Sequence, residues 1–300
     1  MRLTRTVVET RAALAALPRP LGFVPTMGAL HEGHLSLVDA ARERCASVAA
    51  SVFVNPTQFG RGEDLDRYPR DLAGDLELLA ARGAELVFAP DAEEMYPPGF
   101  ATLVHVGGPL TESLEGAGRP GHFDGVAVIV AKLLGVVGPD VLFLGEKDAQ
   151  QLAVIRRLVR DLDLPVEVAG VATVREPDGL AMSSRNAYLS AEERAQAPDL
   201  REALLAGAAA AGSGASPDDV IAVTATTLRK PPGTAPSPAG ARAPLEVDYV
   251  DVVDADSFEK RQIIGPRSLL VAALRLGSTR LIDNIALAPS SAYPAGDATV

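Results

Sequence analysis

Short apolar runs alternate with amphipathic stretches through the first half of the chain. The runs lack the regular apolar–polar alternation of a strand with one wet face, so they predict parallel strands buried on both faces. The stretches between them carry apolar residues at helical spacing, and several of them end at Pro or Gly. We predict strands at 21–24, 47–54, 84–89, 141–144, 166–168 and 171–174, and helices at 4–17, 35–46, 71–82, 126–137 and 149–161. Strand–helix alternation of this kind predicts an α/β domain with a doubly wound parallel sheet.

The pattern changes after residue 175. An Ala-rich helix is predicted at 192–211, and another at 217–228, where Ser216 is a suitable N-cap. The stretch 230–244 is rich in Pro, Gly and Ala, which is typical of a flexible loop or linker. Strand-like runs separated by turns follow at 245–253, 268–276 and 279–287. Helices followed by a small antiparallel sheet predict an α+β domain. We therefore expect one domain at 1–175 and a smaller lid domain at 176–300.

The composition narrows the classes of partner. With 300 residues, 47% of them hydrophobic, the chain can build one large or two ordinary cores. Its net charge of −11 disfavours a broad nucleic-acid-binding face, which needs clustered Lys and Arg, but not a small anionic ligand. The single cysteine, Cys45, excludes an internal disulfide and any multi-Cys metal site. Its place on the apolar stripe of the helix at 35–46 predicts that it packs in the core.

Neither a targeting peptide nor a membrane span is predicted. The N-terminal segment carries arginines, but Arg5, Glu9 and Arg11 interrupt any apolar stretch of the kind a signal peptide requires. The longest apolar run, 126–137, is interrupted by Lys132 and is shorter than the ~20 residues of a membrane span. We therefore expect a cytoplasmic protein with no membrane partner.

The stretch 25–34, Pro-Thr-Met-Gly-Ala-Leu-His-Glu-Gly-His, joins a predicted strand to a predicted helix. A helix start offers backbone N–H groups and the positive end of the helix dipole, and together these bind anions. Gly28 and Gly33 allow the backbone to approach a ligand closely. His31 and His34 lie three residues apart and can face the same way. This combination predicts phosphate binding.

Two other roles are open for His31 and His34. The pair can simply cap or pack the helix. It can also supply two zinc ligands, but zinc needs a third and a fourth, and only His105 and His122 remain, with no metal-binding pattern around them. We therefore expect no zinc.

A second charged segment, Gly145-Glu146-Lys147-Asp148, follows another predicted strand. The Lys147 ammonium can neutralise a phosphate, and Asp148 can hold Mg²⁺ directly or through water. Only four of the 28 basic residues are lysines, so a lysine at this place is less expected by chance. Gln151 follows on the next predicted helix, where it can face the same pocket. An ordinary charged loop is the alternative.

Other loops offer hydrogen-bonding groups. The loop 182–186, Met-Ser-Ser-Arg-Asn, has the composition of a segment that closes over a polyphosphate and stabilises developing charge. Asn55 and Gln58 follow a buried strand, and their amides can bind hydroxyl and carboxylate groups. Arg119 and His122 are open equally to ligand binding and to a subunit interface. Because ligands of open parallel sheets bind where the strands end, we expect the loops that follow strands to form one site.

Taken together, these segments resemble the pantothenate synthetase (pantoate–β-alanine ligase) family. The stretches 25–34, 55–60, 145–151 and 182–186 match in order, residue type and spacing, and the resemblance covers nearly the whole chain. More distantly, 31–34 and 182–185 look like the two signatures of class I aminoacyl-tRNA synthetases and nucleotidylyltransferases. The second signature lacks the lysines of the synthetases, and the chain has no room for an anticodon-binding part.

The resemblance implies a Rossmann-like domain and a two-step ligation. Pantoate would attack the α-phosphate of ATP, in the presence of Mg²⁺, to give pantoyl adenylate and pyrophosphate. The amine of β-alanine would then attack the acyl carbon to give pantothenate and AMP. The resemblance also implies a homodimer formed through the first domain, and no organic prosthetic group.

Residue roles follow from the same resemblance. Catalysis would rest on His34, His31, Lys147, Ser183 and Arg185, with His34 as proton donor or phosphate stabiliser. Gln58 and Gln151 would hold pantoate, Gln58 would also lie near β-alanine, and Asn55 would lie nearby. Asp148 is the candidate Mg²⁺ ligand. The residues implied in ATP binding are Met27, Gly28, Ala29, Leu30, His31, Glu32, Gly33, His34, Gly145, Glu146, Lys147, Asp148, Val174, Met182, Ser183, Ser184 and Arg185.

Two alternatives of other classes are weighed against the ligase. One is a nucleotidylyltransferase of the same fold that stops after making an activated product. The other is a non-catalytic nucleotide-binding protein, although a degenerate site would have lost one of His34, Lys147, Ser183 or Arg185, and none is lost. The chain departs from the family pattern at 211–244, which looks lengthened.

Overall fold

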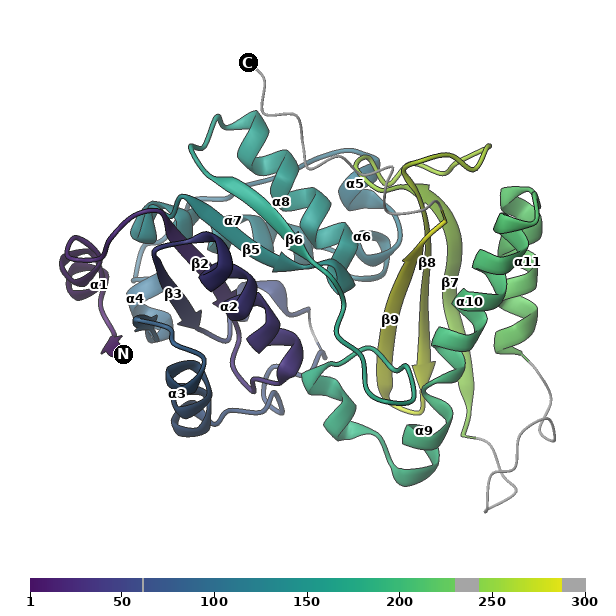
Figure 1. Cartoon of the computed structure of the whole chain (residues 1–300), viewed down its shortest axis with the longest axis horizontal. Coiled ribbons are helices and arrows are strands. Elements are labelled where there is room, and N and C mark those ends of the chain that lie inside the picture. The colour runs from purple at the N-terminus through teal and green to yellow at the C-terminus, as the bar shows by residue number, and fades with distance from the viewer. Residues whose placement is uncertain (61, 230–242, 288–300) are drawn as a thin grey trace. The chain divides into compact units, whose positions relative to one another are not determined.

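The computed structural model describes residues 1–60, 62–229 and 243–287 (Figure 1). The chain divides into two compact units. The first comprises Met1–Glu146 and Gln150–Val174, and the second comprises Lys147–Ala149 together with Arg175–Val300 as far as it is described. The three residues Lys147–Ala149 thus pack with a part of the chain that follows them by more than 25 positions.

The first unit is built on a six-stranded parallel sheet. The strands stand in the order β1-β4-β3-β2-β5-β6, and every neighbouring pair is parallel. From β2 the chain runs to β3 and β4 on one side, and it then crosses to β5 and β6 on the other side of β2. The switch point of the sheet therefore lies between β2 and β5. The strands are β1 (Arg2–Thr4), β2 (Leu21–Thr26), β3 (Ser47–Val52), β4 (Leu86–Phe88), β5 (Val141–Gly145) and β6 (Glu167–Val171).

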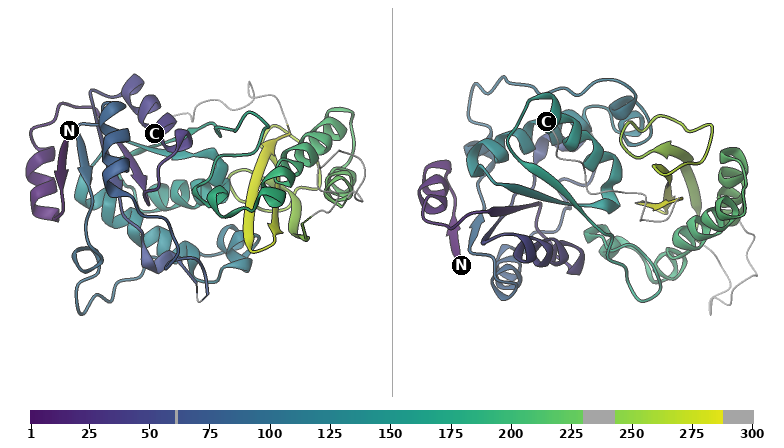
Figure 2. Two further views of the ribbon diagram at one scale, coloured as in Figure 1. Left: turned by 90° about the horizontal axis from the view of Figure 1, so that it is seen from below. Right: turned by 45° about the horizontal axis from the view of Figure 1, so that its top comes forward.

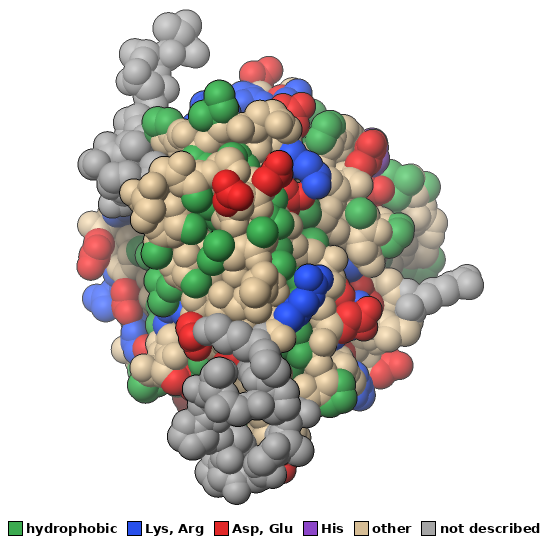
Figure 3. All heavy atoms as spheres, turned by 90° about the vertical axis from the view of Figure 1, so that its right-hand side faces the viewer, with side chains coloured by type: hydrophobic (Ala, Val, Ile, Leu, Met, Phe, Trp, Pro, Cys, Tyr) green, Lys and Arg blue, Asp and Glu red, His purple; other side chains and the backbone are tan. Residues whose placement is uncertain are grey.

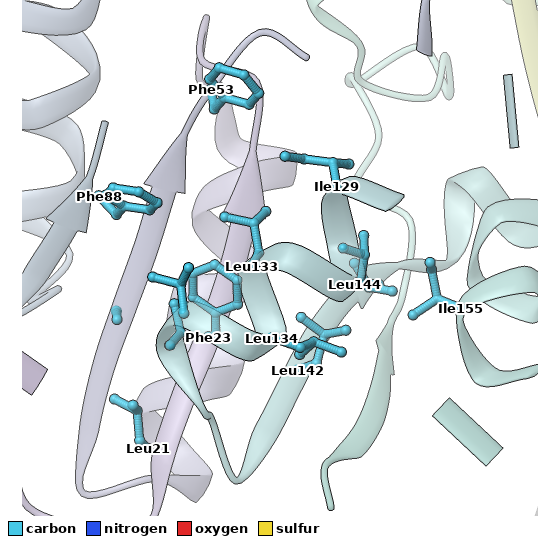
Figure 4. Packing of buried hydrophobic residues seen from close by; sticks show 14 of the residues in the cluster. Leu21, Phe23, Phe53, Phe88, Ile129, Leu133, Leu134, Leu142, Leu144 and Ile155 are labelled. Carbon is cyan, nitrogen blue, oxygen red and sulfur yellow. The ribbon is translucent and has the colours of Figure 1, made fainter. Parts of the chain in front are cut away.

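Helices cover both faces of this sheet (Figure 1). Successive strand residues point to opposite faces, so Phe23 of β2 packs with one set of helices and Val24 with the other. Figure 4 shows Phe23 and Leu142 beside Leu133 and Leu134 of α7. One face carries α1 (Val7–Leu14), α7 (His122–Val137) and α8 (Ala149–Asp161), and the other carries α2 (Glu32–Arg44) and α3 (Leu72–Ala81). The short helices are η1 (Pro56–Gln58), α4 (Ala92–Met95), α5 (Pro109–Glu112), α6 (Glu115–Gly118) and η2 (Glu146–Asp148).

The second unit is a three-stranded antiparallel sheet with helices on one face. The strands β7 (Leu245–Asp254), β8 (Ser268–Leu276) and β9 (Thr279–Ala286) stand in the order β7-β8-β9. Two helices, α10 (Asp199–Gly212) and α11 (Pro217–Leu228), lie side by side against it (Figure 2). Leu204, Val220 and Leu270 are fully buried in the core between them. Figure 3 shows a face of the molecule on which hydrophobic side chains lie among scattered charged ones. The remaining helices are η3 (Ser184–Tyr188) and α9 (Ala191–Gln196).

The predicted fold class, a doubly wound parallel sheet followed by a smaller α+β part, is confirmed. The limits of α8 and α11 are those predicted, and Ser216 is the N-cap of α11. Cys45 is not inside α2 but at its C-cap, where it is half-buried against the core. Burial raises the pKa of its thiol. In the described residues, no helix is both long and apolar enough to cross a membrane.

Several predicted elements were wrong in detail. The single helix predicted at 192–211 is two helices, because Pro198 lies between α9 and α10 and supplies no N–H to continue the first. In place of two strands at 166–168 and 171–174 there is one strand, β6, which covers residues 167–171. The helix predicted at 4–17 begins only at Val7, after the strand β1, which is too short to show a periodic pattern. Most of the predicted linker, 230–242, lies outside the described residues.

Candidate functional site

The turn between β2 and α2 has a tightly specified backbone. Gly28 and Ala29 are in the left-handed region, with φ of 85° and 51°. The buried Asp75 of α3 accepts hydrogen bonds from the N–H groups of Ala29, at 3.0 Å, and Leu30, at 2.8 Å. A Cβ at position 28 would lie 2.8 Å from the carboxylate of Asp75, so this position requires glycine on grounds of both space and φ. The carboxylate therefore fixes the turn that leads into the histidine pair.

His31 and His34 form a capping box at the start of α2. His31 is the N-cap, and its Nδ1 accepts from the N–H of Gly33 at 3.1 Å. Nδ1 of His34 accepts in turn from the N–H of His31 at 3.4 Å. Because each Nδ1 is an acceptor, the proton of each neutral ring is on Nε2. The ring centroids lie 4.1 Å apart, so the two histidines do face the same way. The pair caps the helix and also presents Nε2–H groups where an anion would bind.

Two acidic residues near this turn have distinct positions. The exposed carboxylate of Glu32 points away from the turn and pairs with Arg82, the C-cap of α3, at 2.5 Å. Burial raises the pKa of Asp75, and the hydrogen bonds from Leu30 and Ala29 act against that rise. Asp75 was not predicted as a site residue. Its signal in the sequence is a carboxylate on the apolar face of a helix, four residues before the buried Leu79.

Asn55 and Gln58 lie together in the segment that follows β3. The buried Asn55 caps η1, and its Nδ2 donates to the carbonyl of Gly125, at 3.0 Å, and to Oε1 of Gln58, at 3.1 Å. Nε2 of Gln58 contacts the sulfur of Met27 at 2.9 Å. The structure therefore brings Gln58 to the same turn that carries the histidine pair.

Arg119 and His122 hold the backbone of Gln58 within this chain. Nη2 of Arg119 donates to the Gln58 carbonyl at 3.2 Å, and Nδ1 of His122 lies 2.8 Å from the same oxygen. Arg119 also forms a two-point ion pair with Glu63, at 2.7 Å for each bond. Burial, with the positive charge of Arg119, lowers the pKa of His122 to about 4. Since Nη1 of Arg119 faces Nε2 of His122 at 3.0 Å, the neutral ring donates through Nδ1.

Gln151 and its neighbour Gln150 differ in position. Gln150 is buried, and its amide bonds the N–H of Glu115 and the carbonyls of Leu110 and Ser113, which joins α8 to the segment of α5 and α6. Gln151 is half-buried on the same helix. Its role in pantoate binding stays a prediction.

The turn after β5 divides between the two units. Gly145 and the exposed Glu146 belong to the first unit, where the Glu146 carboxylate lies beside Gly170. Lys147 and Asp148 belong to the second, and Nζ of Lys147 lies 3.5 Å from Oδ1 of Asp148. Only 20% of the Lys147 side chain is exposed.

The loop 182–186 is held by hydrogen bonds within the second unit. Ser183 caps η3, and its Oγ accepts from the N–H of Arg185 at 3.3 Å. Nδ2 of Asn186 donates to the carbonyl of Ala181 at 3.1 Å. Ser184 and Arg185 are half-buried, and so is Val174, the last residue of the first unit. Met182 at the start of the loop is half-buried as well.

Asp148 is compatible with magnesium carried by a nucleotide. Across 1–60, 62–229 and 243–287, no three His, Cys, Asp or Glu side chains are grouped as metal ligands. The Asp148 carboxylate is half-exposed. A single accessible carboxylate is the usual protein contribution to Mg²⁺ that is bound mainly by phosphates and water, whereas a zinc site needs three or four protein ligands.

Comparison with known proteins identifies a family of ligases. The family model for pantoate-beta-alanine ligase matches residues 2–286. A pantothenate synthetase of Rhizorhabdus wittichii is 51% identical over 293 residues, which cover 97% of this chain and 100% of the relative. The crystal structure of pantothenate synthetase from Thermus thermophilus has a TM-score of 0.89 at 50% identity, over 96% of this chain and 100% of that one.

A second solved structure is more distant in sequence. It is the pantoate-beta-alanine ligase of Francisella tularensis complexed with beta-gamma ATP and beta-alanine, with a TM-score of 0.77 at 30% identity over 96% of this chain and 98% of that one. The resemblance carried by the four motif segments is thus confirmed, since the family model covers residues 2–286. This chain belongs to the pantoate–β-alanine ligase (pantothenate synthetase) family.

Proposed function

We propose that this chain condenses pantoate with β-alanine to pantothenate in an ATP-dependent, AMP-forming reaction. The observation that carries the proposal is the turn between β2 and α2. It fixes two Nε2–H imidazoles at a helix start, in a chain that matches a family of amide-forming ligases over residues 2–286. Such a site binds phosphate, which is what activation of a carboxylate by ATP requires.

The reaction proceeds in two steps. A carboxylate is a poor acyl donor, so pantoate first attacks the α-phosphorus of ATP, the bond to the β-phosphate breaks, and pyrophosphate leaves. The amine of β-alanine then attacks the acyl carbon of pantoyl adenylate, loses a proton, and expels AMP. Each step exchanges one bond for another, and no redox change occurs. Positioning of the bound adenylate and the amine supplies much of the second step.

The first step brings an anion towards a polyanion, and basic groups offset the repulsion. We assign this role to His31 and His34 through Nε2–H, to the ammonium of Lys147, and to Ser183 and Arg185 of the loop at η3. The remaining ATP contacts in the proposal come from two groups. The first is the backbone of Met27, Gly28, Ala29, Leu30, Glu32 and Gly33. The second is the set Gly145, Glu146, Asp148, Val174, Met182 and Ser184.

Pantoate and β-alanine need directional hydrogen bonds without added charge. We assign Gln58 and Gln151 to pantoate, with Gln58 also near β-alanine and Asn55 orienting Gln58 through its amide. Arg119 and His122 support this group because both bind the Gln58 carbonyl.

Magnesium enters the proposal as Mg·ATP. Asp148 is the residue we assign to it, through a single carboxylate contact. We also propose that the enzyme is a homodimer, as the resemblance to the family implies, and that it acts in the cytoplasm. Light scattering coupled to size-exclusion chromatography measures the mass in solution, and a mass of one chain would contradict the dimer.

Pantoate-dependent exchange of radioactive pyrophosphate into ATP tests the function. The purified protein with Mg²⁺ should show exchange only when pantoate is present, and β-alanine should then release AMP and pantothenate. Absence of exchange would overturn the proposal. Exchange without release of AMP by β-alanine would instead identify a nucleotidylyltransferase.

Two substitutions test the residues. His34→Ala and Lys147→Ala each remove a group that stabilises the phosphoryl transition state, so exchange should fall by roughly 10²–10³-fold. The matched controls are His105→Ala and Lys260→Ala, whose side chains are 65% and 74% exposed and pair with Asp124 and Asp251. These controls should exchange at the wild-type rate. Full exchange in His34→Ala would remove that residue from the mechanism.

A further inference from the structure

The edge strand β9 carries two adjacent polar residues that point to opposite faces of the small sheet. Asp283 is buried on the face covered by α10 and α11, in register with Ala272 of β8. Asn284 points to the other face, in register with Val271. Neither residue belongs to the four motif segments. Asn284 hydrogen-bonds to the motif segment 145–151, and Asp283 hydrogen-bonds to Arg175, which precedes the motif segment 182–186.

Asn284 reaches the turn that carries Lys147. Its Nδ2 donates to the backbone carbonyl of Lys147 at 3.0 Å, and the two residues are 137 positions apart in sequence. Because the bond is made to the main chain of Lys147, it constrains the position from which the lysine side chain extends. Nζ of the same lysine lies 3.5 Å from Asp148, and only 20% of the lysine side chain is exposed.

Asn284 is itself held in place. Its N–H donates to Oδ1 of Asp283 at 2.8 Å. Asp283, with a side chain only 2% exposed, accepts two bonds from the guanidinium of Arg175, at 2.6 and 3.0 Å. Nη1 of Arg175 also donates to the carbonyl of Gly179, at 3.1 Å, in the hairpin that leads into Ser183. The residue that binds the Lys147 carbonyl is therefore held, through its own backbone N–H, by the carboxylate of a buried, two-point ion pair.

We infer that Asn284 is a positioning residue for the adenylation step: its amide fixes the backbone of Lys147 so that the ammonium meets the phosphates of ATP. This inference rests on the proposed function. A lysine ammonium is a point charge on a flexible four-carbon stem, so its position depends on where its main chain is held. Fixing its main chain removes one source of displacement, and a displacement of about 1 Å at a reacting group costs up to 10²-fold in rate.

The role has a specific kinetic consequence. Lys147 acts on the phosphates during adenylation, whereas aminolysis breaks the acyl–phosphate bond of an adenylate that has already lost pyrophosphate. Loss of the Asn284 amide should therefore slow adenylation much more than aminolysis. A residue that only maintained the fold would affect both steps together and would lower the melting temperature.

The test compares Asn284→Ala and Asn284→Asp with wild type. Both remove the Nδ2 donor, and Asp keeps the volume of the side chain, so that a folded variant is available if Ala disturbs the strand. Pantoate-dependent ATP–pyrophosphate exchange should fall between about ten- and a hundredfold. Pantothenate formation from chemically prepared pantoyl adenylate and β-alanine should stay within about twofold. The control is Arg280→Gln on the same face of β9, which removes the bond to Asp248 and should leave both rates at the wild-type level.

Each other outcome decides against the inference. Unchanged exchange in both variants, with an active wild type, would show that the amide does not position Lys147. Parallel loss of exchange and aminolysis, together with a lower melting temperature, would show a structural role only. Absence of exchange in the wild type would instead be the failure of the proposed function, and it is separate because it is measured before any substitution is made.

Discussion

The segments that lead into His31 and into Ser183, one in each unit, are held by different kinds of contact. In the first unit, buried groups bind backbone atoms directly: the Asp75 carboxylate accepts from the N–H groups of Ala29 and Leu30, and the ring of His122 binds the Gln58 carbonyl. In the second unit, the hairpin before Ser183 is held by ion pairs, Arg175 with Asp283 and Arg194 with Asp178. Each contact of the first kind depends on the protonation state of one buried group.

This difference predicts unequal sensitivities. When a change of pH alters the protonation state of a buried group, its hydrogen bonds are lost. The atoms it bonded are then left without a partner, because no water reaches them. An ion pair at the surface exchanges its partner for water and ions at little cost. The pairs of the second unit are themselves unequal, because Asp283 is buried whereas the side chains of Asp178 and Arg194 are 41% and 35% exposed. The three predictions below test this order.

His122 should give the largest effect, as a loss of stability in acid. Its pKa is lowered from 6.5 to about 4, mainly by burial. Between these values the unfolded chain binds a proton that the folded chain does not, so stability falls as pH drops from 6.5 to 4 and the loss is complete below 4. At about 1.36 kcal/mol per pH unit, the loss is about 3 kcal/mol.

Urea unfolding at pH 7, 5.5 and 4 measures the free energy of unfolding of wild type and of His122→Asn. The asparagine keeps a donor for the Gln58 carbonyl but does not titrate. Wild type should lose about 3 kcal/mol more than the variant across this range. His105→Asn is the control, because that ring is exposed, and it should follow wild type. Equal losses in wild type and His122→Asn would show that His122 is protonated without cost.

Asp75→Asn should have the next largest effect. Asparagine offers one acceptor oxygen and an NH₂ group, so one of the two N–H groups of the turn loses its acceptor and faces a donor. A buried donor without a partner costs about 2 kcal/mol, which outweighs the relief of removing a partly desolvated charge because both bonds to the carboxylate are charge-assisted.

The same substitution should raise KM for ATP, since the turn leads directly into His31. Urea unfolding and the exchange assay measure the two effects. Asp71→Asn, at the start of the same helix, is the matched control: Asp71 is an exposed N-cap, and asparagine is an equally good one. If Asp75→Asn is as stable and as active as Asp71→Asn, the carboxylate does not hold the turn.

What the sequence predicted well is what neighbours in sequence determine. The limits of α8 follow from apolar spacing, and those of α11 follow from apolar spacing and from its N-cap, Ser216. The shared direction of His31 and His34 follows from their spacing of three at a helix start. The parallel sheet follows from the alternation of strands and helices, whereas the order of its strands is known only from the structure.

The residues that hold the site were harder to predict, because their partners are far away in the chain. Asp75 binds a residue 46 positions before it, Glu63 one 56 positions after it, and Asn284 one 137 positions before it. No local period connects such pairs. Of these residues, Asp75 could have been noticed in the sequence, because it is a carboxylate on the apolar face of a predicted helix. Such a local inconsistency indicates a buried polar side chain with a specific partner.

Arg194→Gln should give the smallest effect. The pair with Asp178 is short, at 2.5 Å, but both side chains are open to water, so its Coulomb energy is screened and is offset by the entropy of holding two long side chains. We expect less than about 1 kcal/mol in the free energy of unfolding, and exchange within about twofold of wild type. In about 1 M salt, where the Debye length is about 3 Å, the difference should shrink further. A loss of activity as large as that of Lys147→Ala would mean that an exposed ion pair positions the loop at Ser183, and the contrast between the buried and the exposed pair of this hairpin would then fail.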